Sequence, residues 1–102
     1  MFASLRKLFG GSSPKVKRLL DDGAVVVDVR TPYEFRSGHI PGSRNIPLDA
    51  LPNKIGELKK LNKTIITVCR SGSRSSMAKD MLVAAGINAY NGGMWTDFKN
   101  AG

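Results

Sequence analysis

Two short runs rich in β-branched residues constrain the fold of this 102-residue chain more than any other feature of its sequence. The first run covers residues 24–29 and the second covers residues 64–68. Such runs are typical of strands buried on both faces, as in a parallel sheet that is covered by helices. Helical segments separate the two runs along the chain, so the sequence predicts an α/β domain with right-handed crossovers.

Capping residues and glycines mark the predicted helices. Ser13 and Pro14 have the form of an N-cap followed by proline at the first helical position, and Gly23 is expected to end that helix. Thr31 and Glu34 have the spacing of a capping box, which predicts a short second helix. Further helices are predicted over residues 53–60 and 75–85, and further short strands over residues 44–46 and 87–90.

The larger apolar side chains are expected in the core. Two methionines share a helical stripe with smaller apolar residues in the segment 75–85. We therefore interpret Met77 and Met81, together with Tyr33, Phe35 and Tyr90, as core residues.

The composition fits one compact domain and argues against several other classes of protein. Hydrophobic residues make up 41% of the chain and charged residues 24%, which is ordinary for a globular domain. The single cysteine cannot form an internal disulfide, and His39 is the only histidine, so we expect no metal and no cofactor. No apolar run approaches the roughly 20 residues that span a bilayer, and no cleavable signal is evident. We expect a cytoplasmic protein without stable membrane insertion.

A linker-like stretch, residues 10–13, divides the chain into a flexible N-terminal arm over residues 1–12 and one domain over residues 13–102. The net charge of +8 is concentrated in residues 1–20 and 53–102, but no block of five or six like charges occurs. We therefore expect no nucleic-acid partner. A basic module that binds nucleic acid or an acidic membrane face is retained as an alternative function.

The most informative segment for function runs from Cys69 to Ser75, where a predicted buried strand ends and a helix begins. The carboxyl ends of parallel strands are where α/β folds place their ligands. A short loop at this point directs backbone N–H groups inward, toward the positive end of the helix dipole, and so forms a cradle for an anion. The predicted cradle residues are Arg70, Ser71, Gly72, Ser73, Arg74 and Ser75.

Cys69 is the candidate nucleophile. A free thiol has a pKa of about 8.5, and a helix N-terminus with nearby cations brings it to ~3.5–7.5. We therefore predict a thiolate near neutral pH, which is the reactive form of cysteine. The alternative is a buried structural cysteine, which the Gly, Ser and Arg residues of the loop argue against.

Four ordered motifs resemble those of the single-domain rhodaneses, or sulfurtransferases. The motifs are VDVRTPYEF (27–35), GHIPGS (38–43) with NIP (45–47), CRSGSRS (69–75) and GGMW (92–95). The resemblance implies a parallel sheet of about five strands flanked by helices on both faces. It also implies that Cys69 carries sulfane sulfur as a persulfide. The implied partners are small anionic sulfur donors such as thiosulfate, and an acceptor such as cyanide, a cellular thiol or a protein.

Two alternative activities would use the same cysteine. Cysteine-based phosphatases resemble this loop but have five residues between Cys and Arg, whereas four separate Cys69 from Arg74. The loop length therefore favours the rhodanese resemblance. A persulfide carrier or redox-trafficking domain that serves a protein partner is a further alternative.

Other motif residues are given supporting roles. We interpret Asp28 and Arg30 as a structural ion pair, with substrate contact by Arg30 as the alternative, and His39 as part of a structural loop. Trp95 resembles the packing tryptophan of the family and could line the mouth of the site. Arg70 is expected at that mouth, where it would attract anionic donors. Arg74 occupies a position where the family often has a cation, and Glu34 is interpreted as a helix cap.

Overall fold

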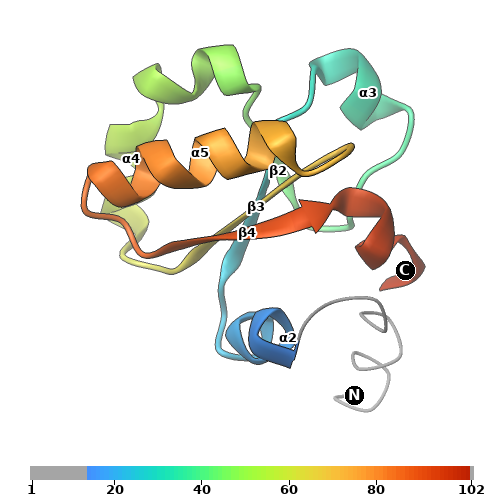
Figure 1. Cartoon of the computed structure of the whole chain (residues 1–102), viewed down its shortest axis with the longest axis horizontal. Helices are drawn as coiled ribbons and strands as arrows, with labels where there is room; N and C mark the ends of the chain where they lie inside the picture. The colour runs from blue at the N-terminus through green and yellow to red at the C-terminus, as the bar shows by residue number, and fades with distance from the viewer. Residues whose placement is uncertain (1–13, 102) are drawn as a thin grey trace.

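The computed structural model describes residues 14–101, so the predicted arm over residues 1–12 and the Ser13 cap lie outside the described residues. Four parallel strands form one sheet in the order β2-β1-β3-β4 (Figure 1). The described strands agree approximately with the five that the resemblance implied. Their bounds are β1 (Val25–Asp28), β2 (Arg44–Asn45), β3 (Ile65–Cys69) and β4 (Ala89–Met94).

Helices cover both faces of the sheet, as predicted. Helices α4 and α5 lie on one side and α2 lies on the other (Figure 1). Short helical turns fill the connections near the ends of the strands. The helical elements are α2 (Pro14–Asp21), α3 (Pro32–Arg36), η1 (Leu48–Asn53), α4 (Ile55–Leu61), α5 (Ser73–Ala84) and η2 (Trp95–Ala101).

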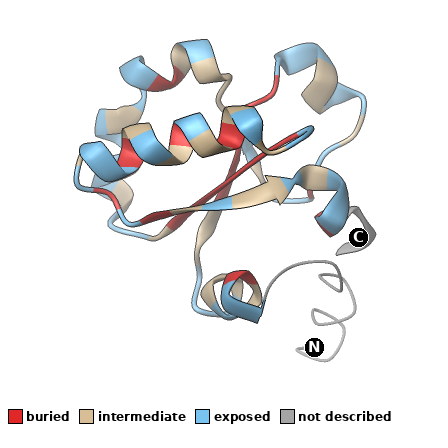
Figure 2. Ribbon diagram, in the orientation of Figure 1, coloured by how far each residue is buried: buried red, intermediate tan, exposed pale blue. Residues whose placement is uncertain are grey.

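The alternation of side chains along each strand divides the core into two clusters. Val27 and Cys69 point to the face covered by α4 and α5, where they pack in one cluster with Leu58 and Leu82. The neighbouring residues along each strand point to the opposite face of the sheet. Val26, Ile66 and Val68 pack there with Val16 and Phe98. The two central strands are consequently buried on both faces (Figure 2).

Several predicted boundaries differ from the structure, and two of the differences have an evident cause. The helix predicted over residues 53–60 is α4, which begins only at Ile55 because a separate 3-10 turn that contains Pro52 comes first. The strand predicted over residues 87–90 is β4, which starts two residues later and continues to Met94 through a Gly-Gly pair. Glycines are depleted in strands, which explains why the sequence pattern ended the strand too early.

The prediction of a core position was wrong for Tyr33 and Met77, which are 74% and 51% exposed. Tyr33 lies on α3, a helix of five residues with none buried. On α5, Ala78 and Leu82 face the sheet at helical spacing, and Met77 projects from a neighbouring part of the helix surface.

A β-bulge in β4 changes the direction of the chain beside the carboxyl end of β3. Thr67 pairs with Asn91 but Val68 pairs with Gly93, so Gly92 is an extra residue on β4. A Cβ atom at Gly92 would lie 2.7 Å from Cγ2 of Ile66, which explains the glycine at this position. Bulges of this kind redirect side chains near functional sites.

Two further observations concern binding classes. No helix within residues 14–101 is long and apolar enough to cross a membrane. The same part of the chain contains no group of three or more His, Cys, Asp or Glu side chains that could hold a metal ion.

Candidate active site

Cys69 is the last residue of β3 and lies at the carboxyl edge of the parallel sheet. Its side chain is buried, with 0% exposure, on the face covered by α5. Gly72 follows three residues later with a φ of 100°, a left-handed conformation that glycine adopts readily. This turn brings the chain back over Cys69 and starts α5 at Ser73.

The turn directs backbone donors at the sulfur atom of Cys69. The Gly72 N–H donates to Sγ at 2.9 Å and the Ser75 N–H at 3.4 Å. The thiol in turn donates to Oγ of Ser75 at 3.4 Å. Burial raises the pKa of the Cys69 thiol, but hydrogen bonds from the Ser75 side chain and from the Ser75, Gly72 and Ser71 backbone outweigh it, and the pKa lies below its ordinary value.

The three serines of the loop are placed differently. Ser75 is buried against Cys69, whereas Ser71 and Ser73 are exposed. Neither exposed hydroxyl makes a hydrogen bond with any other described residue. The structure therefore brings Ser75 to the sulfur and leaves the other two hydroxyls facing solvent.

The guanidinium of Arg74 binds a carboxylate outside the loop. Its two terminal nitrogens donate to Oε1 and Oε2 of Glu34 at 2.8 and 3.0 Å, a bidentate geometry that joins α5 to α3. The hydrogen bond that Arg74 donates to Glu34 is the main cause that raises the pKa of Arg74 above its usual range. The sequence placed Arg74 in the anion cradle, and the structure places its charged end on Glu34.

Glu34 has two functions that the sequence showed only in part. It completes the predicted capping box with Thr31, and it also holds Arg74, forty residues further along the chain. The hydrogen bond from Arg74, followed by that from the Thr31 backbone, lowers the pKa of Glu34 from 4.5 to about 2. The capping-box motif explained the first function, and no sequence signal indicated the second.

Asp28 and Arg30 form a buried ion pair at the end of β1. Nη2 of Arg30 lies 2.7 Å from Oδ2 of Asp28, and Nε contacts both carboxylate oxygens. The same Nη2 donates to the Gly38 carbonyl at 2.7 Å, and the guanidinium lies 4.3 Å from the centre of the Trp95 ring. This pair joins β1, the loop before β2 and the start of η2.

A hollow of about 340 Å³ opens beside the loop. Arg70 and Trp95 line it, together with Tyr33, Glu34 and Arg30. The guanidinium of Arg70 is exposed and makes no hydrogen bond or ion pair with the described residues. The structure places this free cation at the hollow, and its role at the mouth of a site stays a prediction.

His39 lies away from the sulfur. Its ring stacks on Phe35 with a centroid distance of 3.7 Å, and Nδ1 lies 2.8 Å from the Phe35 carbonyl oxygen. The ring is exposed and makes no hydrogen bond with Cys69. These contacts hold the loop that follows α3, in keeping with a structural role.

Asn91 is a site residue that the sequence did not indicate. Its side chain accepts hydrogen bonds from the Ser75 hydroxyl at 2.7 Å and from the Gly93 N–H at 2.8 Å. Its position at the β-bulge accounts for its proximity to the Cys69 loop. A register irregularity of this kind has no signature in a single sequence.

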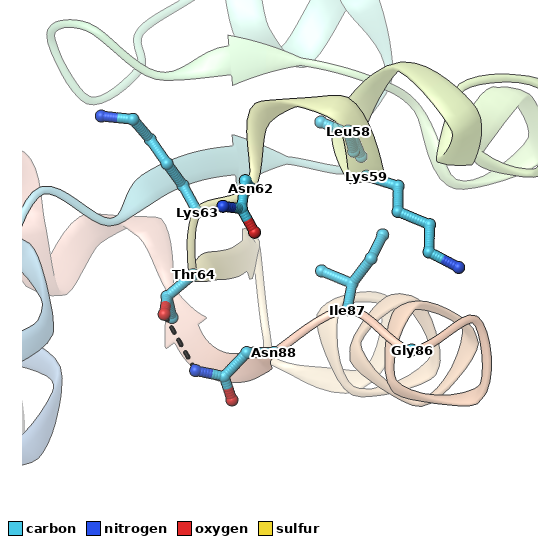
Figure 3. Close-up of a pocket in the computed structure, with 8 residues that line it drawn as sticks. All are labelled: Leu58, Lys59, Asn62, Lys63, Thr64, Gly86, Ile87 and Asn88. Atoms are coloured by element: carbon cyan, nitrogen blue, oxygen red, sulfur yellow. Dashed lines mark hydrogen bonds between the residues drawn. The ribbon is translucent and has the colours of Figure 1, made fainter.

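A larger hollow, of about 480 Å³, lies at the opposite end of the sheet (Figure 3). Leu58 and Ile87 contribute apolar side chains, and Asn62, Thr64 and Asn88 contribute polar ones. Figure 3 shows the ammonium groups of Lys59 and Lys63 extending in opposite directions. Because its charged groups diverge, this hollow has no set of donors aimed at one point.

The fold and the Cys69 loop together define an α/β domain whose single cysteine lies in a backbone cradle at the ligand-binding edge of a parallel sheet. A family model described as rhodanese-like domain matches residues 12–100. The chain belongs to this family.

Named relatives agree with this assignment. A thiosulfate sulfurtransferase, GlpE, from Stutzerimonas stutzeri is 39% identical over 66 residues, which cover 65% of this chain and 60% of that protein. The human single-domain sulfurtransferase TSTD1 superposes with a TM-score of 0.70 at 26% identity, covering 83% of this chain and 89% of that one. A rhodanese from E. coli, solved with anions, has a TM-score of 0.68 at 28% identity, with coverages of 74% and 91%.

Proposed function

We propose that this chain is a sulfurtransferase that transfers sulfane sulfur from thiosulfate or a persulfide donor to a thiophilic acceptor through a persulfide on Cys69. The observation that carries the proposal is the convergence of backbone donors on a buried sulfur whose pKa is lowered. A cradle that stabilises a thiolate also stabilises the anionic outer sulfur of a persulfide. The names of the relatives support the same reaction class.

The reaction has two balanced half-steps. The Cys69 thiolate attacks the outer sulfur of thiosulfate, the S–S bond of the donor breaks, and sulfite leaves with the bonding electron pair. The enzyme then holds Cys–S–S⁻. Cyanide, or a thiolate acceptor, attacks the outer sulfur and leaves as thiocyanate or a persulfide, which regenerates the thiolate of Cys69. No other cysteine is present in the chain, so the acceptor comes from outside it.

The loop residues have separate parts in this proposal. Gly72 and Ser75 supply the backbone donors to sulfur, and Arg70 attracts the anionic donor to the mouth. Arg74 acts indirectly, because its guanidinium is engaged by Glu34 and holds α5 against α3. This engagement argues against the phosphatase alternative, which needs an arginine free to bind phosphate. Because Cys69 is fully buried, the proposal needs a rearrangement of its surroundings that exposes the sulfur to the donor.

The partners and setting follow from the same chemistry. Small anionic sulfur donors and a thiol or protein acceptor fit the site, and a cytoplasmic setting fits a chain with one free cysteine. The alternative of a nucleic-acid module has less support, because basic residues such as Lys17 and Lys60 lie on helices that cover opposite faces of the sheet.

Intact-mass spectrometry after incubation with thiosulfate tests the proposal. We expect a gain of about 32 Da that cyanide removes as thiocyanate, which distinguishes a persulfide from an oxidised cysteine. The Cys69→Ser variant should show neither the adduct nor thiocyanate formation, with an unchanged circular dichroism spectrum. A chain that gains no sulfur from thiosulfate or from a thiol persulfide would refute the proposed function.

A further inference from the structure

The hydroxyl of Ser75 has more partners than it has protons. Its oxygen lies 3.4 Å from Sγ of Cys69, 3.0 Å from the Gly72 carbonyl and 2.7 Å from Oδ1 of Asn91. A hydroxyl donates one hydrogen bond at a time. Where this proton points therefore decides whether Ser75 supports the thiol or the thiolate of Cys69.

The orientation of the Asn91 amide is fixed by two backbone groups. The Gly93 N–H can only donate, and it lies 2.8 Å from Oδ1. The Gly72 carbonyl can only accept, and it lies 3.3 Å from Nδ2. The atom that faces Ser75 is consequently the amide oxygen, which cannot donate, so the Ser75 hydroxyl must donate to it.

We propose that Asn91 is a positioning residue that holds the Ser75 proton away from the Cys69 sulfur and so sets how readily the attacking thiolate forms. With the proton on the Asn91 side, Ser75 presents a lone pair to sulfur and accepts from the thiol. When Cys69 loses its proton to a base in solvent, the Ser75 O–H rotates and donates to the thiolate. Oδ1 of Asn91 then retains only the Gly93 N–H.

The β-bulge makes this arrangement possible. The extra residue Gly92 displaces the register between Thr67 and Val68, and it brings Asn91 and Gly93 to the start of α5. One amide thereby contacts the cysteine loop through Gly72, the helix through Ser75 and its own strand through Gly93. The inference deepens the proposed function, because sulfur transfer begins with this thiolate.

Titration of the Cys69 thiolate by its absorbance near 240 nm tests the inference without any sulfur donor. Cys69 is the only cysteine of the chain, so the signal has one thiol source. Asn91→Ala removes the competing acceptor and should lower the titration midpoint by about half a pH unit, the scale of one hydrogen bond shared with the Gly72 carbonyl. Asn91→Asp adds a charged acceptor and should raise the midpoint.

The opposite directions separate this role from a structural one, which would move both midpoints the same way. In a Ser75→Ala background the Asn91→Ala shift should disappear, and Asn88→Ala, at the other end of the sheet, should have no effect. Every variant keeps the same charged groups around the loop, so these groups do not cause a difference between the midpoints. They are Asp28, Arg30, Glu34, Arg70 and Arg74.

An Asn91→Ala midpoint that is unchanged or raised, or a shift that persists without the Ser75 hydroxyl, overturns the inference. If the alanine variant does not fold, Asn91→Asp is titrated with and without the Ser75 hydroxyl, and a midpoint that does not rise, or that rises equally in both backgrounds, refutes the inference. Thiosulfate charging of the wild-type chain is measured separately, so failure of the proposed function is distinguishable from failure of this inference.

Discussion

The two ends of the sheet both carry hollows, of about 340 and 480 Å³, but they use their polar groups differently. At the carboxyl end, backbone donors converge on Cys69 and two ion pairs tie the surrounding segments together. At the amino end the lysine ammonium groups diverge, and the neighbouring Asn88 donates only to Thr64. The smaller hollow lies beside the proposed nucleophile, and we therefore base the functional proposal on the convergence of donors and not on the size of a hollow.

The largest contrast in stability should come from a buried aspartate at one end and an exposed aspartate at the other. Asp28→Asn leaves Arg30 buried without its charged partner, and we expect the free energy of unfolding to fall by about 3–5 kcal/mol. Asp22→Asn, at an exposed position between α2 and β1, should change it by less than about 0.5 kcal/mol. Urea unfolding of both variants measures the two changes in the free energy of unfolding. Equal decreases would show that the buried ion pair contributes no more to stability than an exposed aspartate.

A second contrast compares an ion pair at the site with one on the surface. Glu34→Gln keeps the helix cap but loses the charge that binds Arg74, and it should cost about 1 kcal/mol because solvent partly screens the pair. Glu57→Gln, in an exposed pair with Lys54, should have no measurable effect.

The Glu34 contrast should depend on pH. The folded-state pKa of about 2 lies below the ordinary value of 4.5, so the folded chain binds fewer protons than the unfolded chain between them. The stabilisation is complete above about pH 4.5 and is lost as the pH falls toward 2. The difference in stability between wild type and Glu34→Gln should shrink over this window. A difference that stays constant from pH 6 to pH 3 would contradict the ionic origin.

The smallest contrast concerns the exposed cations. Arg70→Ala should raise the KM for thiosulfate about two- to fivefold at low ionic strength, and by less at 150 mM salt, because the effect is long-range attraction. Lys63→Ala removes the same charge at the amino end and should leave this KM unchanged. Steady-state kinetics at two salt concentrations would disprove the attraction if Arg70→Ala behaved like Lys63→Ala.

The sequence predicted the architecture because burial leaves a strong pattern. The β-branched runs that became β1 and β3 are buried on both faces, and the Gly72 turn follows from the Cys-to-Ser segment. The ion pair between Asp28 and Arg30 could also be predicted from the sequence, because the two residues lie only two positions apart.

The remaining features depend on contacts between distant segments. Arg74 could not be assigned to Glu34, forty residues away, because either an anionic ligand or a carboxylate satisfies a guanidinium. The bulge at Gly92 depends on the close approach of Ile66 from β3. Without knowledge of this bulge, the sequence does not indicate that the Asn91 side chain faces Ser75. Exposure of Met77 likewise depends on which side of α5 meets the sheet.

The groups that activate Cys69 all come later in the chain than the cysteine itself. Gly72 and Ser75, which donate to the sulfur, follow by a few residues, whereas Asn91, which we propose draws the Ser75 proton away from it, belongs to the last strand. During synthesis, which proceeds from the N-terminus, the thiol leaves the ribosome before any of its partners. Until the Cys69 loop and the first turn of α5 form, these donors are not directed at the sulfur, and oxidants meet a thiol without the hydrogen bonds that lower its pKa. The lowered pKa of this thiol is thus a property the chain acquires only when the segment that follows Cys69 has folded.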